Sequence, residues 1–319
     1  MNLTRREILR LLAIGGAGFF VGCNSTLRDT MQGKLKTPAS SVDTLILDFD
    51  GTLTNVEEEA KDYVDGYCQS LGRELGLSRD EIEDYWNESK AKILKNPEKY
   101  GWELEGIIVA SATSDPLIIC YSIADEICVR LGKTFSQKER RDLLGKLYLE
   151  NYPKMGESFK EGADEFLSEV WDLFKGRVQV VTNSSTEKVK KKIGHLPSDH
   201  SRIPIVGGAK KYVVVDKWEA VPKTTTIPGL ERPVYLRREH YWQALNRIIQ
   251  EQRTDLSGLA VVGDIWELDL ALPQHLGTVV GLTPQSTTPQ FERNAVANYR
   301  RGFLSDNLEE VYRNLKERV

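Results

Sequence analysis

Three short, mainly apolar segments of the chain each end in a polar turn, and this pattern constrains the fold more than any other feature. The segments are residues 44–47, 178–181 and 259–262, and amphipathic helical patterns separate them. Apolar runs of this length are typical of strands buried on both faces, and strands that alternate with helices form a parallel sheet. We therefore expect an α/β fold with a Rossmann-like three-layer core, in which helices cover both faces of a parallel sheet.

The first segment runs directly into two carboxylates, Asp48 and Asp50, which are followed by a Gly-Thr turn. Two anions this close together at the edge of a sheet repel each other unless something compensates them. A divalent cation removes this penalty, and the pair is then able to act as a nucleophile and an acid/base. The leading hypothesis is metal-dependent phosphoryl chemistry through an aspartyl intermediate.

The long stretch between the first and second segments has the spacing of helices. Apolar residues recur at helical intervals in residues 56–77 and 117–131. Two capping boxes, at residues 78–81 and 136–139, each mark the start of a further helix. We find no strand pattern in this stretch, and we expect an all-helical cap domain over residues 56–152.

The cap interrupts a catalytic core that we place at residues 42–55 and 153–319. Residues 212–215 and 224–227 have strand character, and they indicate a β-hairpin inserted at about residues 210–232. The hairpin could serve as a second cap or as a dimer contact.

Polar groups also follow the second and third segments. Thr182 and Asn183 come directly after residue 181, and Asp264 follows Gly263, with Asp269 five positions later. Ligands of open parallel sheets bind beyond the carboxyl ends of the strands, so we expect these groups to meet the first acidic pair. Oxygen ligands of this kind suit a hard cation such as Mg²⁺.

This set of residues resembles the motifs of the haloacid dehalogenase-like (HAD) hydrolase superfamily, of the phosphatase type with a helical cap. The ordered motifs of that superfamily are an Asp-x-Asp loop, a Thr or Ser, a Lys, and an acidic Gly-Asp-x(4)-Asp loop. Asp48 and Asp50 match the first motif, Thr182 the second, and Asp264 with Asp269 the fourth. The resemblance covers about residues 42–319.

The resemblance implies a catalytic role for the first motif. Asp48 would be the nucleophile that attacks phosphorus, and Asp50 the acid that protonates the leaving alcohol and then the base that activates water. Thr182, with the amide of Asn183, would hydrogen-bond the phosphoryl oxygens. An aspartate at position 50 favours phosphoryl transfer over dehalogenation.

The resemblance also implies a Mg²⁺ site. The metal would be held by the carboxylates of Asp48 and Asp264 and by the backbone carbonyl of Asp50, with Asp269 orienting this set of ligands. Bound Mg²⁺ would offset the repulsion between the dianionic substrate and the nucleophile.

The third motif has no obvious match. A lysine is expected near the start of the helix that precedes residue 259, but residues 236–241 contain none. Arg237 is our first candidate for this catalytic and substrate-binding position, because arginine keeps the charge and can grip phosphate in a fork. The alternatives are Lys210, Lys211 or Lys217, and the interpretation that Arg237 and Arg238 lie on a solvated helix end.

The N-terminus has the features of an export signal. Residues 1–23 contain paired arginines, then a short apolar segment, then a small residue before Cys23. These parts resemble a twin-arginine signal and a lipoprotein processing box. They imply interaction with the export machinery, cleavage before Cys23 and lipid attachment there, with residues 24–41 as a linker. An uncleaved membrane anchor is the alternative, and either would tether a catalytic part that faces the periplasm or cell exterior.

The charge of the chain argues against nucleic-acid binding. Its 47 acidic and 43 basic residues are spread along the sequence, whereas a dedicated nucleic-acid binder concentrates basic residues on one surface. We expect an exported Mg²⁺-dependent phosphomonoester hydrolase that acts on a small phosphorylated metabolite. A non-catalytic phospho-ligand-binding lipoprotein of the same fold and a phosphotransferase remain as alternatives.

Overall fold

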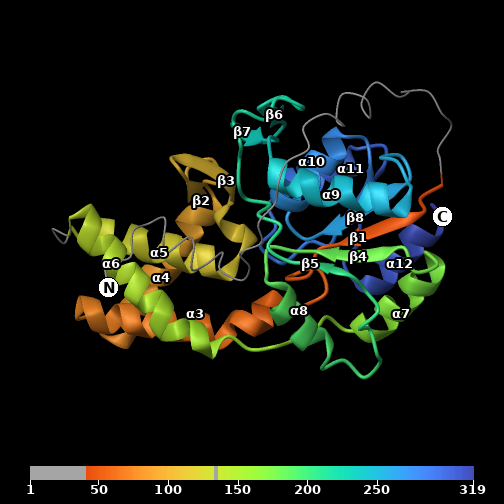
Figure 1. Ribbon diagram of the computed structural model, residues 1–319. Coiled ribbons are helices and arrows are strands. Elements are labelled where there is room, and N and C mark those ends of the chain that lie inside the picture. The colour runs from red at the N-terminus through yellow and green to blue at the C-terminus, as the bar shows by residue number, and fades with distance from the viewer. Residues whose placement is uncertain (1–40, 133–135) are drawn as a thin grey trace.

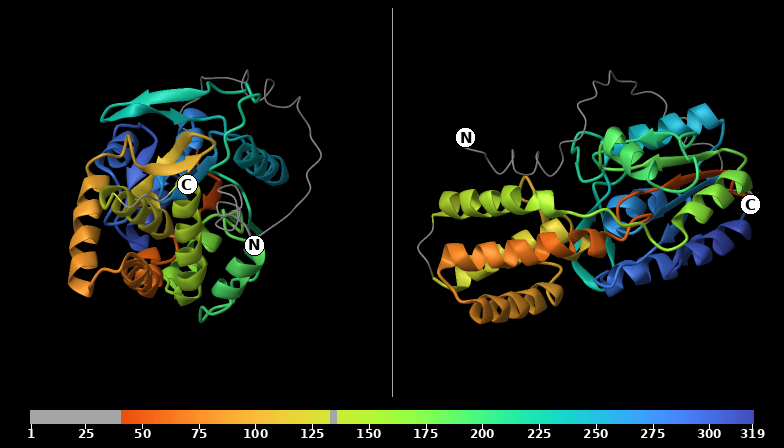
Figure 2. Two further views of the ribbon diagram at one scale, coloured as in Figure 1. Left: turned by 90° about the vertical axis from the view of Figure 1, so that its left-hand side faces the viewer. Right: turned by 90° about the horizontal axis from the view of Figure 1, so that it is seen from below.

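The computed structural model describes residues 41–132 and 136–319. The predicted export signal, the lipidation site Cys23 and the linker up to residue 40 lie outside the described residues. Within the described ranges, no helix is long and apolar enough to cross a membrane. The described chain forms an elongated molecule in which a mainly helical cap lies beside an α/β core (Figure 1 and Figure 2).

The core is built on a six-stranded sheet in which all neighbours are parallel. The strand order is β10-β9-β8-β1-β4-β5. The central strand β1 (Thr44–Leu47) is fully buried and pairs with β4 (Val178–Val181) and β8 (Leu259–Gly263). The other strands are β5 (Ile205–Val206), β9 (Val279–Leu282) and β10 (Gly302–Leu304). The predicted parallel sheet is confirmed.

Helices cover both faces of the sheet, so the core has the predicted three layers (Figure 1). Residue Ile46 faces one side, and Leu45 and Leu47 face the other, as the alternation of a strand requires. The first side packs against α9 (Glu239–Gln252), α10 (Ala271–His275) and α11 (Gln290–Ala297). The second side packs against α7 (Ala163–Leu173), α8 (Thr186–Ile193) and α12 (Leu308–Lys316).

The helices of the cap surround their own apolar cluster. They are α3 (Val56–Leu75), α4 (Arg79–Leu94), α5 (Pro116–Arg130) and α6 (Gln137–Asn151). Both predicted capping boxes are formed, at Ser78 and at Ser136. Short 3-10 turns at Ala112–Ser114 and Tyr152–Lys154 precede α5 and follow α6.

The cap also contains a β-hairpin, so the prediction of an all-helical cap was wrong. Strand β2 (Gly101–Leu104) pairs with the antiparallel strand β3 (Ile107–Ser111). The connecting residues Glu105 and Gly106 both have positive φ angles, of 51° and 85°. Such turns are usually marked by Asn-Gly or Asp-Gly. The Glu-Gly pair gives a weaker signal in the sequence.

The hairpin of the core differs from the predicted pairing. Strand β6 (Thr224–Ile227) pairs with β7 (Leu230–Tyr235), whereas residues 212–215 form no strand. Val213 and Val214 pack against the apolar cluster of the cap instead. Their strand-like composition therefore reflects a contact between core and cap.

Buried contacts from the core hold the cap in place. Arg238 is 0% exposed, and its guanidinium donates to the backbone carbonyls of Val109 in β3 and of Lys211. Arg238 is thus not on a solvated helix end. Trp102 of the cap stacks against Tyr212 of the core, with ring centroids 4.7 Å apart. These contacts fix the β2–β3 hairpin next to the segment that carries Lys211.

Candidate active site

Asp48 lies at the carboxyl end of β1, in a group of buried charges. Lys211 is 1% exposed and donates from Nζ to Asp48 Oδ1 at 2.7 Å and to Asp269 Oδ1 at 2.8 Å. The hydroxyl of Thr52 donates to the other oxygen of Asp48 at 3.2 Å. One local donor and one donor from a distant part of the chain therefore fix the orientation of this carboxylate.

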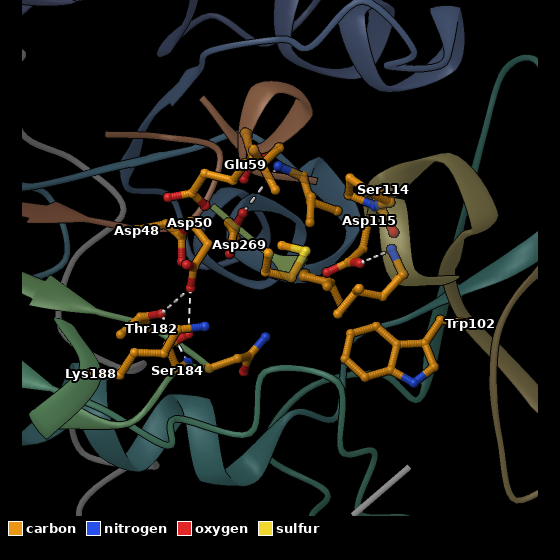
Figure 3. Close-up of a pocket in the computed structure, with 18 of the residues that line it drawn as sticks. Asp48, Asp50, Glu59, Trp102, Ser114, Asp115, Thr182, Ser184, Lys188 and Asp269 are labelled. Carbon is orange, nitrogen blue, oxygen red and sulfur yellow. Dashed lines mark hydrogen bonds between the residues drawn. The ribbon is translucent and has the colours of Figure 1, made fainter. Parts of the chain in front are cut away.

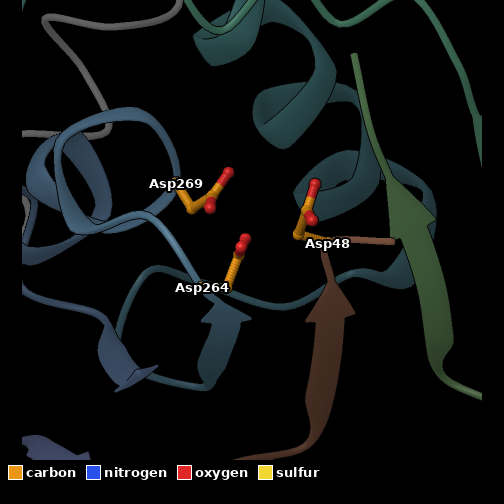
Figure 4. Close-up of side chains that lie close together, drawn as sticks. All are labelled: Asp48, Asp264 and Asp269. Atoms are coloured by element: carbon orange, nitrogen blue, oxygen red, sulfur yellow. The ribbon is translucent and has the colours of Figure 1, made fainter. Parts of the chain in front are cut away.

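Asp48, Asp264 and Asp269 form a compact acidic cluster (Figure 4). All three are buried, and one oxygen of each lies within 4.8 Å of the others. Gly51 permits this approach, because its φ is +81° and a Cβ there would lie 2.0 Å from Asp264 Oδ2.

One oxygen of this cluster lacks a donor. Asp264 Oδ1 is buried and has no hydrogen-bond partner among the described residues. A buried carboxylate oxygen without a donor is costly, and a hard divalent cation satisfies it. The residues present therefore fit a Mg²⁺ ion.

Asp269 reaches the cluster from a single π-helical turn, Trp266–Leu270 (η3), which begins two residues after Asp264. The amide of Ile265 donates to Asp269 Oδ2 at 3.1 Å, and the hydroxyl of Tyr241 donates to the Asp269 carbonyl at 2.9 Å. Asp264 lies before this turn and Asp269 within it. The amide of Asp269 donates to the carbonyl of Ile265 at 2.9 Å, which folds Asp269 back beside Asp264.

Burial and nearby carboxylates shift the pKa values of Asp48 and Asp264. Burial raises the pKa of Asp48 to about 7. The charge of Lys211 offsets part of this rise, and the charge of Asp269 adds to it. Burial and the neighbouring Asp48 also raise the pKa of Asp264. Burial opposes the charge on Lys211, but the carboxylates of Asp269 and Asp48 outweigh it and raise the pKa of Lys211. Lys211 thus stays cationic. Lys160 also interacts with Asp264 and Asp48, although burial lowers the pKa of Lys160. A bound divalent cation would favour the ionised forms of Asp48 and Asp264 at neutral pH.

The side chain of Asp50 lies apart from this cluster and borders a cavity. Ser184 donates to Asp50 Oδ2 at 2.6 Å, and Thr182 approaches the same oxygen at 3.5 Å (Figure 3). Ser184 was not among the predicted site residues, although it directly follows the predicted pair Thr182 and Asn183. The prediction that the backbone carbonyl of Asp50 binds metal stays a prediction.

Thr182 and Asn183 both line the cavity. The hydroxyl of Thr182 accepts a hydrogen bond from the amide of Ser184 at 3.1 Å. The side-chain oxygen of Asn183 accepts one from the amide of Lys211 at 2.8 Å. Asn183 therefore fixes the backbone that carries the buried lysine.

The structure does not bring Arg237 to this site, which corrects our first choice for the third motif. Arg237 donates to the backbone carbonyls of Val221 and Asp216 and does not line the cavity. The cation beside Asp48 is Lys211, one of the alternatives. It reaches the site because residues 207–211 run along the end of β4, where the amide of residue 209 donates to the Thr182 carbonyl.

A buried ion pair that the sequence did not reveal lies next to Asp50. Lys192 Nζ in α8 is 2.6 Å from Glu59 Oε1 in α3 and 3.8 Å from Asp50 Oδ1. Glu59 also accepts a hydrogen bond from the amide of Ser158, where the chain leaves the cap. The lysine-rich stretch 188–192 is the signal in the sequence, and such a run usually indicates a solvated helix face.

A cavity of about 160 Å³ separates the core from the cap at this point. Asp48, Asp50 and Thr182 lie on its core side, and Trp102 and Asp115 face them from the cap (Figure 3). A small ligand held here would contact both parts of the molecule. The predicted nucleophile and acid/base therefore line the same cavity.

Comparisons with known proteins identify similar folds but no family. No protein-family model matches the chain, and no curated protein matches it either. A HAD-hydrolase of Bacillus subtilis, YfnB, whose structure is described as bound to magnesium, is 14% identical with a TM-score of 0.46, over 86% of this chain and 99% of that one. A haloacid dehalogenase-like hydrolase from Xanthomonas campestris is 13% identical with a TM-score of 0.44, over 87% and 97%. A 2-haloacid dehalogenase from Pseudomonas syringae is 11% identical with a TM-score of 0.40, over 86% and 99%.

Likeness at these values carries no information about the reaction. Phosphatases and dehalogenases both occur among the similar structures. The function must therefore be argued from the residues of this chain.

Proposed function

We propose that this protein is a Mg²⁺-dependent phosphomonoester hydrolase that acts on a small phosphorylated metabolite through an aspartyl-phosphate intermediate. The observation that carries the proposal is the position of Asp48 between the ammonium of Lys211 and the unpartnered oxygen of Asp264. A carboxylate nucleophile, a fixed cation and an acid/base two residues away are the groups that phosphoryl transfer of this type requires.

The metal would be held by the carboxylates of Asp48 and Asp264 and by the backbone carbonyl of Asp50, with Asp269 beside them. Bound Mg²⁺ would stabilise the charge of the phosphoryl group and reduce its repulsion from Asp48. Lys211 adds a positive charge at the same place through its hydrogen bond to Asp48.

In the first half-reaction, a carboxylate oxygen of Asp48 forms a bond to phosphorus while the bond from phosphorus to the substrate oxygen breaks. Protonated Asp50 gives its proton to the departing oxygen, so that an alcohol leaves. Ser184 holds Asp50 in position for this transfer. Thr182 and Asn183 would hydrogen-bond the phosphoryl oxygens.

In the second half-reaction, the carboxylate of Asp50 takes a proton from water as the water oxygen bonds to phosphorus. The bond from phosphorus to Asp48 then breaks, and inorganic phosphate leaves. The cap would exclude bulk water during both steps.

Two alternatives compete with this proposal. A non-catalytic binding protein would be favoured if no lysine lay beside Asp48, and Lys211 occupies that position. Transfer to an acceptor other than water remains a rival outcome, and product analysis with added alcohols distinguishes it from hydrolysis.

We also propose export by the twin-arginine route and lipid attachment at Cys23. The sequence of residues 1–23 is the support for this proposal. Replacing Arg5 and Arg6 by lysine should keep the protein inside the cell, and Cys23→Ala should release it from the membrane fraction.

The phosphatase proposal is tested by phosphate release from a panel of phosphomonoesters, with Mg²⁺ or with chelator. We expect turnover that requires the metal and disappears in Asp48→Asn. Absence of release from every compound, despite measurable Mg²⁺ binding, would favour the binding protein.

A further inference from the structure

The cap side of the cavity presents a carboxylate that the proposed reaction does not use. Asp115 lines the cavity and points into it from the start of α5 (Figure 3). One of its oxygens accepts a hydrogen bond from the amide of Leu117 at 2.6 Å and so caps the helix. Among the described residues, no lysine or arginine forms an ion pair with it, and burial raises the pKa of Asp115. The side chain is partly exposed, and Lys188 acts on it only at longer range. A carboxylate in a cavity without an ion-pair partner favours a ligand that supplies a closer cation.

Aromatic rings line the same cavity as this carboxylate. Trp102 is 8% exposed and lines the cavity beside Asp115. Tyr212 stacks against Trp102 and holds the indole ring in place. Tyr152 lines the cavity as well. An aromatic ring next to a carboxylate is a combination that binds ammonium groups, through cation–π attraction and ion pairing.

The charges around the cavity are arranged with the cations on the core side. Lys211 pairs with Asp48, Lys192 pairs with Glu59, and the proposed metal site lies among the same residues. Lys188 is the basic residue among the described lining residues, and its ammonium lies against Tyr152. The acidic lining residues outnumber it: Asp48, Asp50, Glu59, Asp115, Asp264 and Asp269. Lys188 interacts with Asp50 and Glu59 as well as with Asp115, so Asp115 has no cation of its own.

We propose that Asp115 determines specificity and that the substrates are phosphomonoesters of small alcohols that carry an ammonium group. This inference rests on the proposed phosphatase reaction and adds the class of the alcohol. The phosphate lies over Asp48, and the ammonium group contacts Asp115 and Trp102. A cavity of about 160 Å³ suits a small alcohol. Asp115 repels a substrate that carries a carboxylate in place of the ammonium group, and so weakens its binding.

Three substrates of similar size test the proposal on the full chain with Mg²⁺. They are 2-aminoethyl phosphate, propyl phosphate and carboxymethyl phosphate, which differ mainly in the charge of one end. We expect kcat/KM to fall in that order, by about tenfold at each step. Equal values for the amino and carboxyl compounds would overturn the proposal.

Asp115→Asn separates specificity from helix capping, because Asn caps helices as well as Asp does. We expect the ratio of kcat/KM for the aminoethyl compound to that for the propyl compound to fall to about one. Asp199→Asn, which removes a carboxylate from an exposed turn of the core, is the matched control and should change no ratio. An unaltered ratio in Asp115→Asn would mean that Asp115 only caps α5.

A binding measurement covers the case in which none of these substrates is hydrolysed. 3-Aminopropylphosphonate and butylphosphonate cannot be cleaved as esters, and calorimetry with Mg²⁺ gives their Kd values. We expect 3-aminopropylphosphonate to bind about tenfold more tightly than butylphosphonate to the native chain. The two compounds should bind equally tightly to Asp115→Asn. Selective binding without turnover would reject the phosphatase reaction and retain the ammonium site. Turnover without selectivity would retain the phosphatase reaction and reject the ammonium site.

Discussion

The ammonium of Lys192 and the carboxylate of Glu59 form an ion pair of 2.6 Å that is almost completely shielded from solvent. The pair joins α8 of the core to the first helix of the cap, directly behind Asp50. Removing one partner of such a pair leaves a buried charge without compensation. The pair is therefore a structural support of the loop that carries the proposed acid/base.

Lys192→Met should lower the free energy of unfolding by about 3–5 kcal/mol, because Glu59 would remain buried and unpaired. The double variant Lys192→Met, Glu59→Gln should lose less, since both charges are then absent. Urea unfolding of the three proteins measures the difference. Lys191→Met, at an exposed neighbouring position, is the control and should cost less than about 0.5 kcal/mol. Equal losses of unfolding free energy in Lys191→Met and Lys192→Met would contradict a stabilising role for the buried ion pair.

Lys211→Met should reduce kcat/KM for any phosphomonoester substrate by at least about a hundredfold, because the charge beside Asp48 is lost. Arg237→Met, which removes a cation that contacts only carbonyl groups in the described structure, should change it less than about threefold. Steady-state kinetics on both variants distinguish the two candidates for the third motif. A larger loss of kcat/KM in Arg237→Met than in Lys211→Met would support Arg237 as the residue of the third motif.

Asp50→Asn should affect substrates according to their leaving group. An alkyl phosphate needs the proton of Asp50, so its hydrolysis should slow by about a thousandfold. 4-Nitrophenyl phosphate has a leaving group that departs without protonation, so Asp48 should still be phosphorylated. Because the second half-reaction lacks its base, rapid-mixing experiments should show one burst of 4-nitrophenol per enzyme molecule. The same loss for both esters, without a burst, would argue against an acid/base role.

Mg²⁺ should stabilise the protein more strongly as the pH rises from about 5 to 8. Without metal, the pKa of Asp48 is about 7 in the folded state against an ordinary value of 3.8. Between these values the folded protein binds more protons than the unfolded one, so its stability falls as pH rises. Mg²⁺ binds the ionised carboxylate and competes with those protons.

Melting curves at several pH values, with Mg²⁺ and with chelator, measure this effect. The increase in Tm caused by Mg²⁺ should become larger across the same pH range. An increase that does not depend on pH would place the ion elsewhere. Asp264→Asn, which changes a cluster member outside the Asp-x-Asp loop, should remove most of the effect.

The sheet and the acidic cluster could be predicted because their signals are local. Asp48, Thr182 and Asp264 each follow an apolar strand directly, and the carboxyl ends of parallel strands meet at one edge. Strand position alone was sufficient to bring Asp48 and Asp264 together. The spacing of Asp264 and Asp269 is also visible in the sequence, although the π-helical turn that carries Asp269 is not.

The buried cations could not be predicted in the same way. Lys211 contacts Asp48 across 163 positions, and Lys192 contacts Glu59 across 133. In the sequence both lysines lie next to another lysine, at positions 210 and 191, and neither differs in kind from its neighbour. Their burial depends on how loops and helices pack after the sheet has formed. Such contacts are set by tertiary structure rather than by a local pattern.

The position of β1 has a consequence for the order in which the chain folds. Both hydrogen-bonded neighbours of β1 lie far along the chain, β4 beginning at residue 178 and β8 at residue 259. The cap lies before both of them, and its apolar cluster comes almost entirely from residues 63–148. During synthesis the cap can therefore collapse early, while the strand that carries Asp48 waits for most of the polypeptide to emerge. A chain truncated before β8 would retain a folded cap but leave β1 with an open edge, prone to aggregation.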